Sequence, residues 1–291
     1  MRFIIIGGSG FIGSNLFSFL RKKQQNVVAT YLKKKIYNMI RFDLTRDKIS
    51  NIISDLNAND VVIILSGINS PNTVFDNKNI AYQTNVVSTI ELIKDLNEKK
   101  CKILFMSSTS VFDGTTDFYV ESTKTNPLNT YGKYKQTVEE YLKKNCKNFL
   151  IIRTGWIVGN DKKNMCVVKL TYDTLLSKNA KMAEDNTFCI THIEDIVSSI
   201  YKLMLNSIRN ICHISSSQVI QRVELADFIM KHSKKGALMN YKKVPFSSIK
   251  YSEPRGKLNH LKSEVSFVND NLSFRSPYET IIQKVNILDN F

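Results

Sequence analysis

Short apolar runs alternate with amphipathic stretches through the first half of the chain, and this alternation constrains the fold more than any other feature. Runs rich in Val, Ile and Leu predict buried strands at 2–6, 27–31, 60–65, 101–106 and 148–152. Helix-like stretches separate them, at 11–23, 45–55, 79–98 and 130–146. Strands without polar alternation, each followed by a helix, are typical of a parallel sheet covered on both faces. The sequence therefore predicts an α/β fold with a doubly wound parallel sheet and right-handed crossovers.

The pattern changes after about residue 155, where the predicted elements become shorter and more polar. Helices are predicted at 190–206 and 222–233, and a strand at 211–214. We therefore expect one domain over residues 1–155. A smaller C-terminal lobe would cover residues 156–291, with some recrossing of the chain into the first domain.

The chain is strongly basic, with 41 Lys and Arg residues against 26 Asp and Glu residues and a net charge of +15 at pH 7. Such an excess can indicate a nucleic-acid partner. Here the lysines are spread along the chain in twos and threes and lack interleaved aromatic residues. We therefore predict no nucleic-acid partner, and a basic cleft for a phosphorylated small molecule fits the same charge.

Several other site classes are disfavoured by the composition. No apolar run approaches the roughly 20 residues that cross a bilayer, and nothing at the start marks secretion, so a cytoplasmic protein without a membrane partner is expected. The five cysteines form no Cys-x-x-Cys pair, which indicates buried thiols. The four histidines show no metal-binding spacing, so we predict no metal site.

A glycine motif follows the first predicted strand. Gly7, Gly10 and Gly13 have G-x-x-G-x-x-G spacing and lead into a predicted helix that begins near Phe11 and Ile12. Glycines at such a turn let backbone N–H groups approach a pyrophosphate at the positive end of the helix. The motif predicts a Rossmann dinucleotide-binding domain; a glycine turn without a ligand is the alternative.

The residues after the glycines bear on the choice of cofactor. NAD-selective sites place a carboxylate about 20 residues beyond the glycines, whereas the 2′-phosphate of NADP needs a cation. No acidic residue occurs from Ser14 to Phe42, and the second predicted strand ends in "ATYLKKK". We therefore predict a preference for NADP(H), with Lys33, Lys34 and Lys35 near the 2′-phosphate and with NAD(H) still possible. The alternative is a solvated lysine run in a lysine-rich chain.

A polar stretch from 107 to 135 follows the strand at 101–106 and ends on Tyr131 and Lys135. These two residues are four apart, so they share one face of the predicted helix. The ammonium and the helix N-terminus should both lower the pKa of Tyr131 below about 10. Tyr131 could then give a proton to a carbonyl oxygen that Ser108 also binds. An exposed helix face is the alternative, and Ser107 and Thr109 compete with Ser108.

The glycine spacing, Ser108 and Tyr131-x-x-x-Lys135 together resemble the extended short-chain dehydrogenase/reductase family. "DNTFCITHIEDI" (185–196) and "ICHISSSQVIQRVELADFI" (211–229) are most similar to its dTDP-4-dehydrorhamnose reductase-like branch. The likeness covers nearly the whole chain and becomes thin after about residue 260.

The resemblance implies further site residues. Asp43 and Leu44 would contact the adenine side of the cofactor, Lys135 would also hold the nicotinamide ribose, and Asn85 would support the lysine through water or be an ordinary buried residue. Trp156 would face the substrate sugar or be a core aromatic. Arg255 would bind the diphosphate or be a surface charge. The helices at 79–98 and 130–146 could pair in a homodimer.

The resemblance implies a reductase that acts on a keto group of a nucleotide-activated deoxysugar, of the kind used in surface polysaccharide biosynthesis. The first alternative is a nucleotide-sugar epimerase, which would oxidise and re-reduce its substrate. The second is a cofactor-binding regulatory subunit without turnover. Thr109 and Ser110 stand where dehydratases of the wider family carry an Asp–Glu pair, which argues against loss of water.

Overall fold

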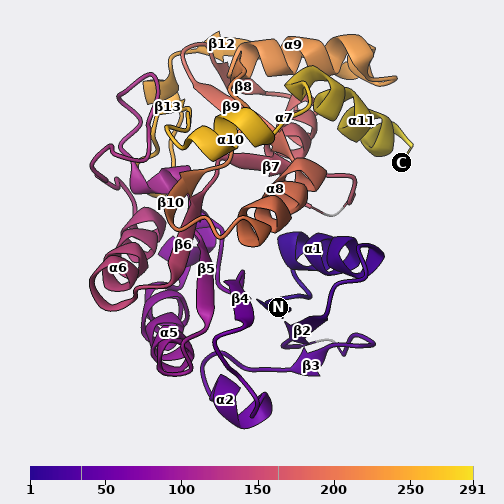
Figure 1. Ribbon diagram of the computed structural model, residues 1–291. Coiled ribbons are helices and arrows are strands. Elements are labelled where there is room, and N and C mark those ends of the chain that lie inside the picture. Colours follow the sequence, from indigo (N-terminus) through magenta and orange to yellow (C-terminus); the bar gives the residue numbers. More distant parts are fainter. Residues whose placement is uncertain (34, 163, 291) are drawn as a thin grey trace. The chain divides into compact units, whose positions relative to one another are not determined.

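The computed structural model describes residues 1–33, 35–162 and 164–290 (Figure 1). The chain divides into two compact units. The first comprises Met1–Phe112, Lys124–Arg153 and Val197–Cys212, and the second comprises Asp113–Thr123, Thr154–Ile196 and His213–Phe291.

The first unit is built on a seven-stranded sheet in the order β10-β6-β5-β4-β1-β2-β3. The strands are β1 (Arg2–Ile6), β2 (Val27–Tyr31), β3 (Ile40–Arg41), β4 (Asp60–Ile64), β5 (Lys102–Met106), β6 (Phe149–Arg153) and β10 (Asn210–His213). The pairs from β3 through to β6 are parallel. The order reverses between β1 and β4, and in open α/β sheets ligands bind beyond the carboxyl ends of the strands at such a point. The predicted doubly wound parallel sheet is confirmed.

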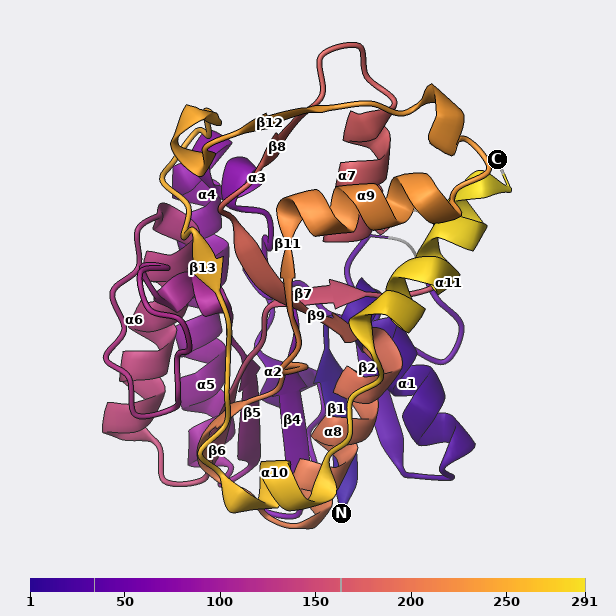
Figure 2. The same ribbon diagram turned by 90° about the horizontal axis from the view of Figure 1, so that it is seen from above.

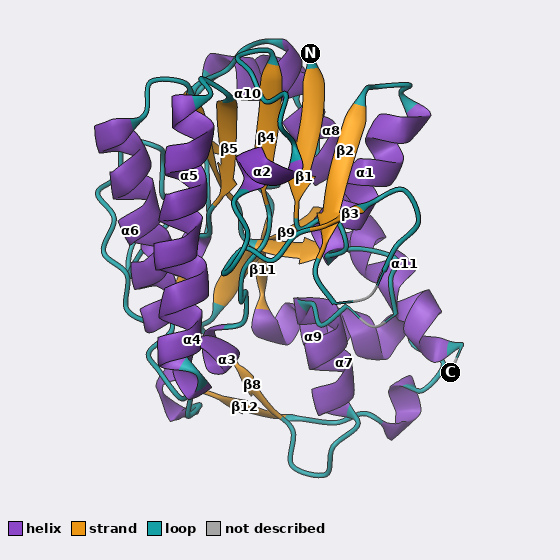
Figure 3. Cartoon of the chain, turned by 90° about the horizontal axis from the view of Figure 1, so that it is seen from below, coloured by secondary structure: helices purple, strands orange, loops and turns teal. Residues whose placement is uncertain are grey.

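Helices cover both faces of this sheet (Figure 3). The helices of this unit are α1 (Phe11–Lys22), α2 (Ile49–Ile52), α3 (Pro71–Asp76), α4 (Lys78–Tyr82), α5 (Thr89–Glu98), α6 (Thr130–Asn145) and α8 (Ile193–Leu205, in this unit from Val197). A π-helical turn, Gln83–Ser88, joins α4 to α5. Residues of α2, α5 and α6 pack with Ile4 and Ile6 on one face. On the other face, Tyr201 of α8 contacts the rings of Phe3 and Phe19.

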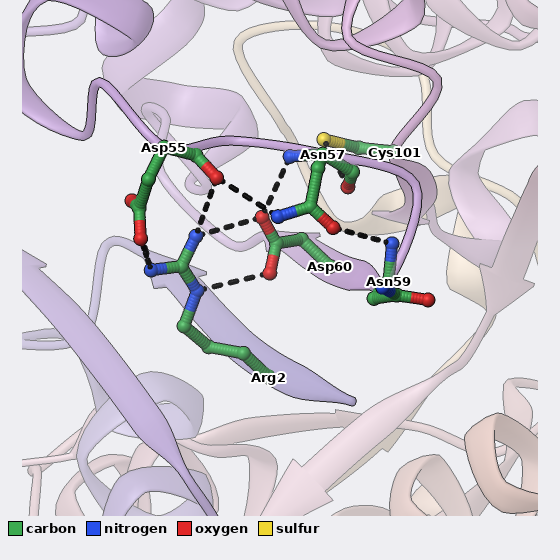
Figure 4. Close-up of polar contacts among 6 residues, drawn as sticks. All are labelled: Arg2, Asp55, Asn57, Asn59, Asp60 and Cys101. Carbon is green, nitrogen blue, oxygen red and sulfur yellow. Dashed lines mark hydrogen bonds and ion pairs between the residues drawn. The ribbon is translucent and has the colours of Figure 1, made fainter.

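A polar cluster fixes the amino-terminal end of β1 (Figure 4). The guanidinium of Arg2 donates to Asp60 at 2.8 and 2.9 Å and to Asp55 at 2.9 and 3.0 Å. Asn57 donates its backbone N–H to Asp60 at 3.0 Å. These bonds tie β1 to the loop before β4 at the amino-terminal ends of these strands, opposite to the end that carries the glycine turn.

The second unit has a smaller sheet in which β7 (Trp156–Val158), β11 (Val219–Gln221) and β13 (Leu258–Asn259) all pair with β9 (Thr187–His192). A separate pair joins β8 (Lys181–Ala183) to β12 (Lys242–Val244). The helices are α7 (Val167–Leu175), α9 (Arg222–His232), α10 (Ser266–Asn271) and α11 (Pro277–Asp289). Helices α7, α9 and α11 pack against one another around a core that includes Phe188, Leu225 and Ile281 (Figure 2).

The middle of the polar stretch that the sequence placed between Ser108 and Tyr131 belongs to this second unit. Tyr119 donates its N–H to the carbonyl of His260 and accepts from the N–H of Lys262, both at 3.0 Å. Leu258 donates to the carbonyl of Gly114 at 3.0 Å.

Three predicted elements differ from the structure. The helix expected at 45–55 is helical only over Ile49–Ile52, the helix expected at 190–206 begins at Ile193 after strand β9, and the strand expected at 211–214 in the small lobe lies in the main sheet beside β6. In the second case a buried strand passes directly into a helix, so the apolar pattern has no break at the boundary. No helix among the described residues is long and apolar enough to span a membrane.

Candidate active site

The glycine turn lies at the carboxyl end of β1. Gly7 adopts φ +92°, a conformation that favours glycine, and donates its N–H to the hydroxyl of Thr30 at 3.0 Å. A Cβ on Gly13 would lie 2.2 Å from the carbonyl oxygen of Gly7, so only glycine lets α1 begin this close to the strand. The first turn of α1 carries no acidic residue. The turn therefore leaves a positive helix end open to an anion.

Ser108, Tyr131 and Lys135 come together at the carboxyl end of β5. Helix α6 begins at Thr130, with Asn129 as its cap, accepting from the N–H of Gly132 at 2.9 Å. A Cβ on Gly132 would lie 2.0 Å from the carbonyl oxygen of Ser110, so the first turn of α6 lies directly against the turn that follows Ser108. The side chains of Tyr131 and Ser108 share a hydrogen bond.

Lys135 lies beneath this pair, one helical turn after Tyr131. Its ammonium is buried, donates to the carbonyl of Met106 at 2.9 Å, and lies 5.8 Å from the centre of the Tyr131 ring and 4.7 Å from that of Phe105. Burial lowers the pKa of Lys135 to about 8, and the charge of Glu139 partly opposes this. The Lys135 ammonium is therefore mostly charged at neutral pH and loses its charge as the pH rises through about 8.

The expected fall in the pKa of Tyr131 is wrong. Burial raises the pKa of Tyr131 to about 12, and the hydrogen bond with Ser108 offsets only part of the effect. The prediction took the ammonium of Lys135 to lie beside the phenol oxygen, whereas it is bound to the carbonyl of Met106. Tyr131 thus keeps its proton at neutral pH, which is the state that a proton donor needs.

The structure distinguishes the competing hydroxyls around this site. Ser107 is buried and donates to Glu139 at 2.5 Å, whereas Ser108 is only partly buried. Ser108 also contacts Ser110, accepting from its N–H at 3.1 Å. Tyr134, one residue before Lys135, donates to the carbonyl of Lys78 and packs edge-on against Tyr82. Ser108 and Tyr131 are therefore the hydroxyls that meet.

Asn85 lies in the π-helical turn and is committed to the loop after β4. Its side chain accepts from the N–H of Ile68 at 2.8 Å and donates to the carbonyl of Ile68 at 2.9 Å. The amide therefore fixes this loop at the reversal point of the sheet.

The residues expected around the adenosine lie beyond β2 and β3. Lys33 and Lys35 are exposed, and Lys34 lies outside the described residues. The carboxylate of Asp43 accepts from the N–H and hydroxyl of Thr45 at 3.0 and 2.8 Å, and these bonds lower its pKa. Leu44 packs against the core of the first unit.

Sequence reasoning missed Arg41 because β3 is only two residues long. Arg41 pairs with Tyr31 at the end of β2, and its side chain is 58% exposed. Its nearest acid is Asp47, at 3.7 Å. Arg41 therefore adds a cation next to the strand end that leads to Lys33.

Trp156 and Arg255 both belong to the second unit. Trp156 begins β7, is partly buried and packs against the core of that unit. Arg255 is partly buried, with its guanidinium 5.6 Å from the centre of the Tyr251 ring.

Arg222 is a second cation near Tyr251 that sequence reasoning missed. It begins α9, donates to the hydroxyl of Thr171 at 3.0 Å and lies 4.7 Å over the ring of Phe188. Burial lowers the pKa of Arg222 to about 10, while Tyr251 acts in the opposite direction on both Arg222 and Arg255. Within the described part of the chain, Arg222 forms no ion pair. A partly buried guanidinium without a carboxylate is suited to an anionic ligand.

Over 1–33, 35–162 and 164–290, no group of three or more His, Cys, Asp or Glu side chains could hold a metal ion. All five cysteines are buried and free of disulfides.

The family model described as RmlD substrate binding domain matches residues 1–285. The dTDP-4-dehydrorhamnose reductase of Salmonella typhimurium is 35% identical over 92 residues, 31% of this chain and 31% of that protein. The methionine adenosyltransferase 2 subunit beta of Xenopus tropicalis is 28% identical over 163 residues, 53% of this chain and 49% of that protein. The matches thus span about half of these curated relatives or less.

Among solved structures, dTDP-4-dehydrorhamnose reductase from Bacillus anthracis in complex with NADP gives a TM-score of 0.81 at 21% identity, and the match covers 99% of each chain. At this identity the likeness establishes the fold.

Proposed function

The chain belongs to the RmlD substrate binding domain family, and we propose that it uses NADP(H) to reduce a keto group on a nucleotide-activated deoxysugar. The membership confirms the resemblance to extended short-chain dehydrogenases/reductases. The observation that carries the proposal is the set of Ser108, Tyr131 and Lys135, in which Tyr131 and Lys135 are buried and Ser108 is partly buried. This set lies at the same carboxyl-terminal edge of the sheet as the glycine turn.

The glycine turn fits a dinucleotide. The close approach of Gly13 to Gly7 and the acid-free start of α1 leave backbone N–H groups for a pyrophosphate. We assign pyrophosphate binding to Gly7, Gly10, Phe11, Ile12 and Gly13. When bound, the reduced nicotinamide would supply the hydride.

The side chains of α6 and β5 then provide the other half of the reduction. A ketone becomes an alcohol when its carbon gains a hydride and its oxygen gains a proton. Tyr131 keeps its proton at neutral pH because its pKa is about 12, so it can donate that proton to the ketone oxygen. Ser108 can donate a second hydrogen bond to the ketone oxygen. The ammonium of Lys135 behind the Tyr131 ring would stabilise the phenolate that remains.

We assign the sugar nucleotide to the second unit, with its diphosphate bound by Arg222 and Arg255. Both guanidiniums lie near Tyr251, and planar guanidiniums bind phosphate oxygens in pairs. Trp156 would contact the sugar ring, whose C–H face suits an indole. A role in surface polysaccharide synthesis stays a prediction, and so does pairing of α4–α5 with α6 in a homodimer.

An epimerase is the first alternative. Its opening half-reaction removes a proton from a substrate hydroxyl, which needs a Tyr131 phenolate, and the raised pKa of Tyr131 disfavours that form. A regulatory subunit is the second alternative. It is favoured by the 28% identity to a methionine adenosyltransferase 2 subunit beta and opposed by the intact Ser108–Tyr131–Lys135 set.

One experiment separates the three functions. Pure protein is mixed with NADPH and a panel of nucleotide-linked 4-keto-deoxysugars, and absorbance at 340 nm is followed together with product analysis. A reductase consumes one NADPH for each alcohol formed. Interconversion of sugars without net NADPH consumption would indicate an epimerase, and tight NADPH binding without turnover of any sugar would indicate a regulatory subunit.

Reversing the charge beside the end of β2 is expected to weaken the binding of NADPH more than that of NADH. In the double variant Lys33→Glu/Arg41→Glu, kcat/KM for NADPH should fall roughly 10- to 100-fold, because hydrogen bonds to a charged group contribute about 1.5–3 kcal/mol. The kcat/KM for NADH, which lacks the 2′-phosphate, should change far less. Lys99→Glu, at an exposed position after α5, is the control for charge alone. Equal losses with both cofactors would contradict the assignment, as would a wild-type preference for NADH.

Removing the guanidinium of Arg222 is expected to weaken substrate binding more than turnover. In Arg222→Ala, the KM for the nucleotide sugar should rise roughly 10- to 100-fold, and the Kd for free nucleoside diphosphate should rise in step. Quenching of Trp156, the only tryptophan, reports binding. Lys231→Ala, an exposed charge on the same helix, is the control. Wild-type nucleotide affinity in Arg222→Ala would remove Arg222 from the site.

A further inference from the structure

A buried ion pair lies one helical turn beyond Lys135. Glu139 on α6 and Arg153 at the end of β6 are 0% and 1% exposed. Arg153 donates to both carboxylate oxygens of Glu139, at 2.6 Å to one and 3.0 Å to the other. Ser107, at the end of the strand run of β5, donates to the same carboxylate at 2.5 Å. The carboxylate of Glu139 thus links α6 to β6 and to the residue that directly precedes Ser108.

The position of this pair coincides with the proposed catalytic residues. Tyr131, Lys135 and Glu139 are spaced by four, so they lie along one face of α6. Ser107 directly precedes Ser108 in the chain. Ser107, which donates to Glu139, directly follows Met106, the last residue of β5, whose carbonyl accepts from Lys135.

Stability alone does not account for a pair of this kind. Desolvating two charges costs about as much as their attraction returns, and apolar side chains of similar volume often stabilise a protein as well or better. The carboxylate does have an electrostatic effect that apolar side chains would lack. It acts on Lys135, where it opposes the lowering of the pKa that burial causes.

The Lys135 ammonium and the Glu139 carboxylate each face a small set of groups. The groups that contact the Lys135 ammonium from α6 and β5 are the Tyr131 ring, the Phe105 ring and the Met106 carbonyl, and among the described residues Glu139 is the charge that acts on it. Glu139 itself faces Arg153 from β6, Ser107 directly after β5, and Lys143 from α6 at 3.8 Å.

We propose that Glu139 is a positioning residue for the reduction: it fixes the β5 turn that orients Ser108 and keeps the Lys135 ammonium charged at neutral pH. The inference rests on the proposed function for its turnover readouts. The two roles can be tested separately. The hydrogen bond from Ser107 to Glu139 would orient Ser108, whereas the charge of the carboxylate acts on Lys135.

The charge is tested with Glu139→Gln, which keeps the shape of the side chain. The pKa of Lys135 is read without turnover from the ¹³Cε shift of labelled lysine, assigned with Lys135→Arg. We expect the midpoint to fall by about one pH unit, and the alkaline limb of kcat/KM to move to lower pH by the same amount. Glu140→Gln, the exposed neighbour on α6, is the matched control and should leave both unchanged.

Glu139→Gln leaves Arg153 buried and unpaired, so folding is checked by circular dichroism. Glu139→Gln/Arg153→Met removes both charges and should fold, and its Lys135 midpoint should fall too, since Glu139 is the charge that acts on Lys135. Ser107→Ala tests orientation: kcat should fall at least about tenfold with the Lys135 midpoint unchanged.

The outcomes are distinct. An unchanged Lys135 midpoint in both Glu139 variants would overturn the charge role, and wild-type kcat in Ser107→Ala would overturn the orientation role. Absence of NADPH oxidation by the wild-type protein with every keto sugar would instead contradict the proposed function, and the NMR midpoint would still decide whether Glu139 acts on Lys135.

Discussion

Tyr131→Phe is expected to lower kcat for the reduction by about 10²–10⁴, the range for loss of a general acid. The substitution keeps the ring, which packs with Val74 and Ala81, and removes only the hydroxyl that bonds to Ser108. Cofactor affinity should stay within about twofold, because the glycine turn is on β1 and α1 and is not changed. Stopped-flow hydride transfer and a separate NADPH titration measure the two quantities.

Tyr134→Phe is the matched control on the same helix. Its hydroxyl donates to the carbonyl of Lys78 at 3.3 Å, and its ring packs edge-on against Tyr82. Turnover should therefore be near that of the wild type. Wild-type kcat in Tyr131→Phe, or a large loss in Tyr134→Phe alone, would mean that the proton comes from elsewhere.

The sequence was sufficient for the parts of the fold in which local pattern and tertiary environment agree. The strands expected at 2–6 and 27–31 have those bounds. Those at 60–65 and 101–106 differ by one residue at one end, and the strand expected at 148–152 is shifted by one residue, to Phe149–Arg153. Four of these runs are buried over almost all of their length, and 27–31 is partly buried. Their mainly apolar residues leave helix or strand as the question, and the short length of each run indicates a strand.

The second unit could not be predicted in the same way. Strands such as β7 and β8 are three residues long, and they exist because β9 and β12 pair with them. Segment Asp113–Thr123 joins this unit through bonds to residues about 140 positions later, such as Tyr119 with His260. Contacts of that range leave no local signal.

The candidate site shows the same division. The spacing of Tyr131 and Lys135 placed both on one helix face, and the structure places them there with Ser108. The electrostatics could not be predicted, because burial outweighs the ammonium and raises the pKa of Tyr131 to about 12. Arg222 was missed for a related reason: only its lack of an acidic partner among the described residues marks it, and that depends on the folded unit.

Lys135→Met is expected to lower kcat/KM by about 10²–10³, as removal of a preorganised charge from an active site does. The substitution removes the ammonium behind the Tyr131 ring and leaves the carbonyl of Met106 without its donor. In the wild type, the pKa of Lys135 is about 8, lowered from its ordinary value by burial. The charged form therefore prevails below pH 8, and kcat/KM should fall as pH rises through that value. In Lys135→Met this limb should be absent, with a low and flat profile from pH 7 to about 9.5.

Lys135→Arg and Lys102→Met make the assignment of the alkaline limb specific. Arginine keeps its charge at every pH used, so Lys135→Arg should retain part of the activity without a limb near pH 8. Lys102 is also buried, and burial lowers its pKa to about 8 as well. It lies at the start of β5, roughly 13 Å along the strand from Met106, so Lys102→Met should leave the limb in place. Loss of the limb in Lys102→Met, or its persistence in Lys135→Met, would show that another group titrates, and the role of Lys135 as the charge that supports Tyr131 would be abandoned.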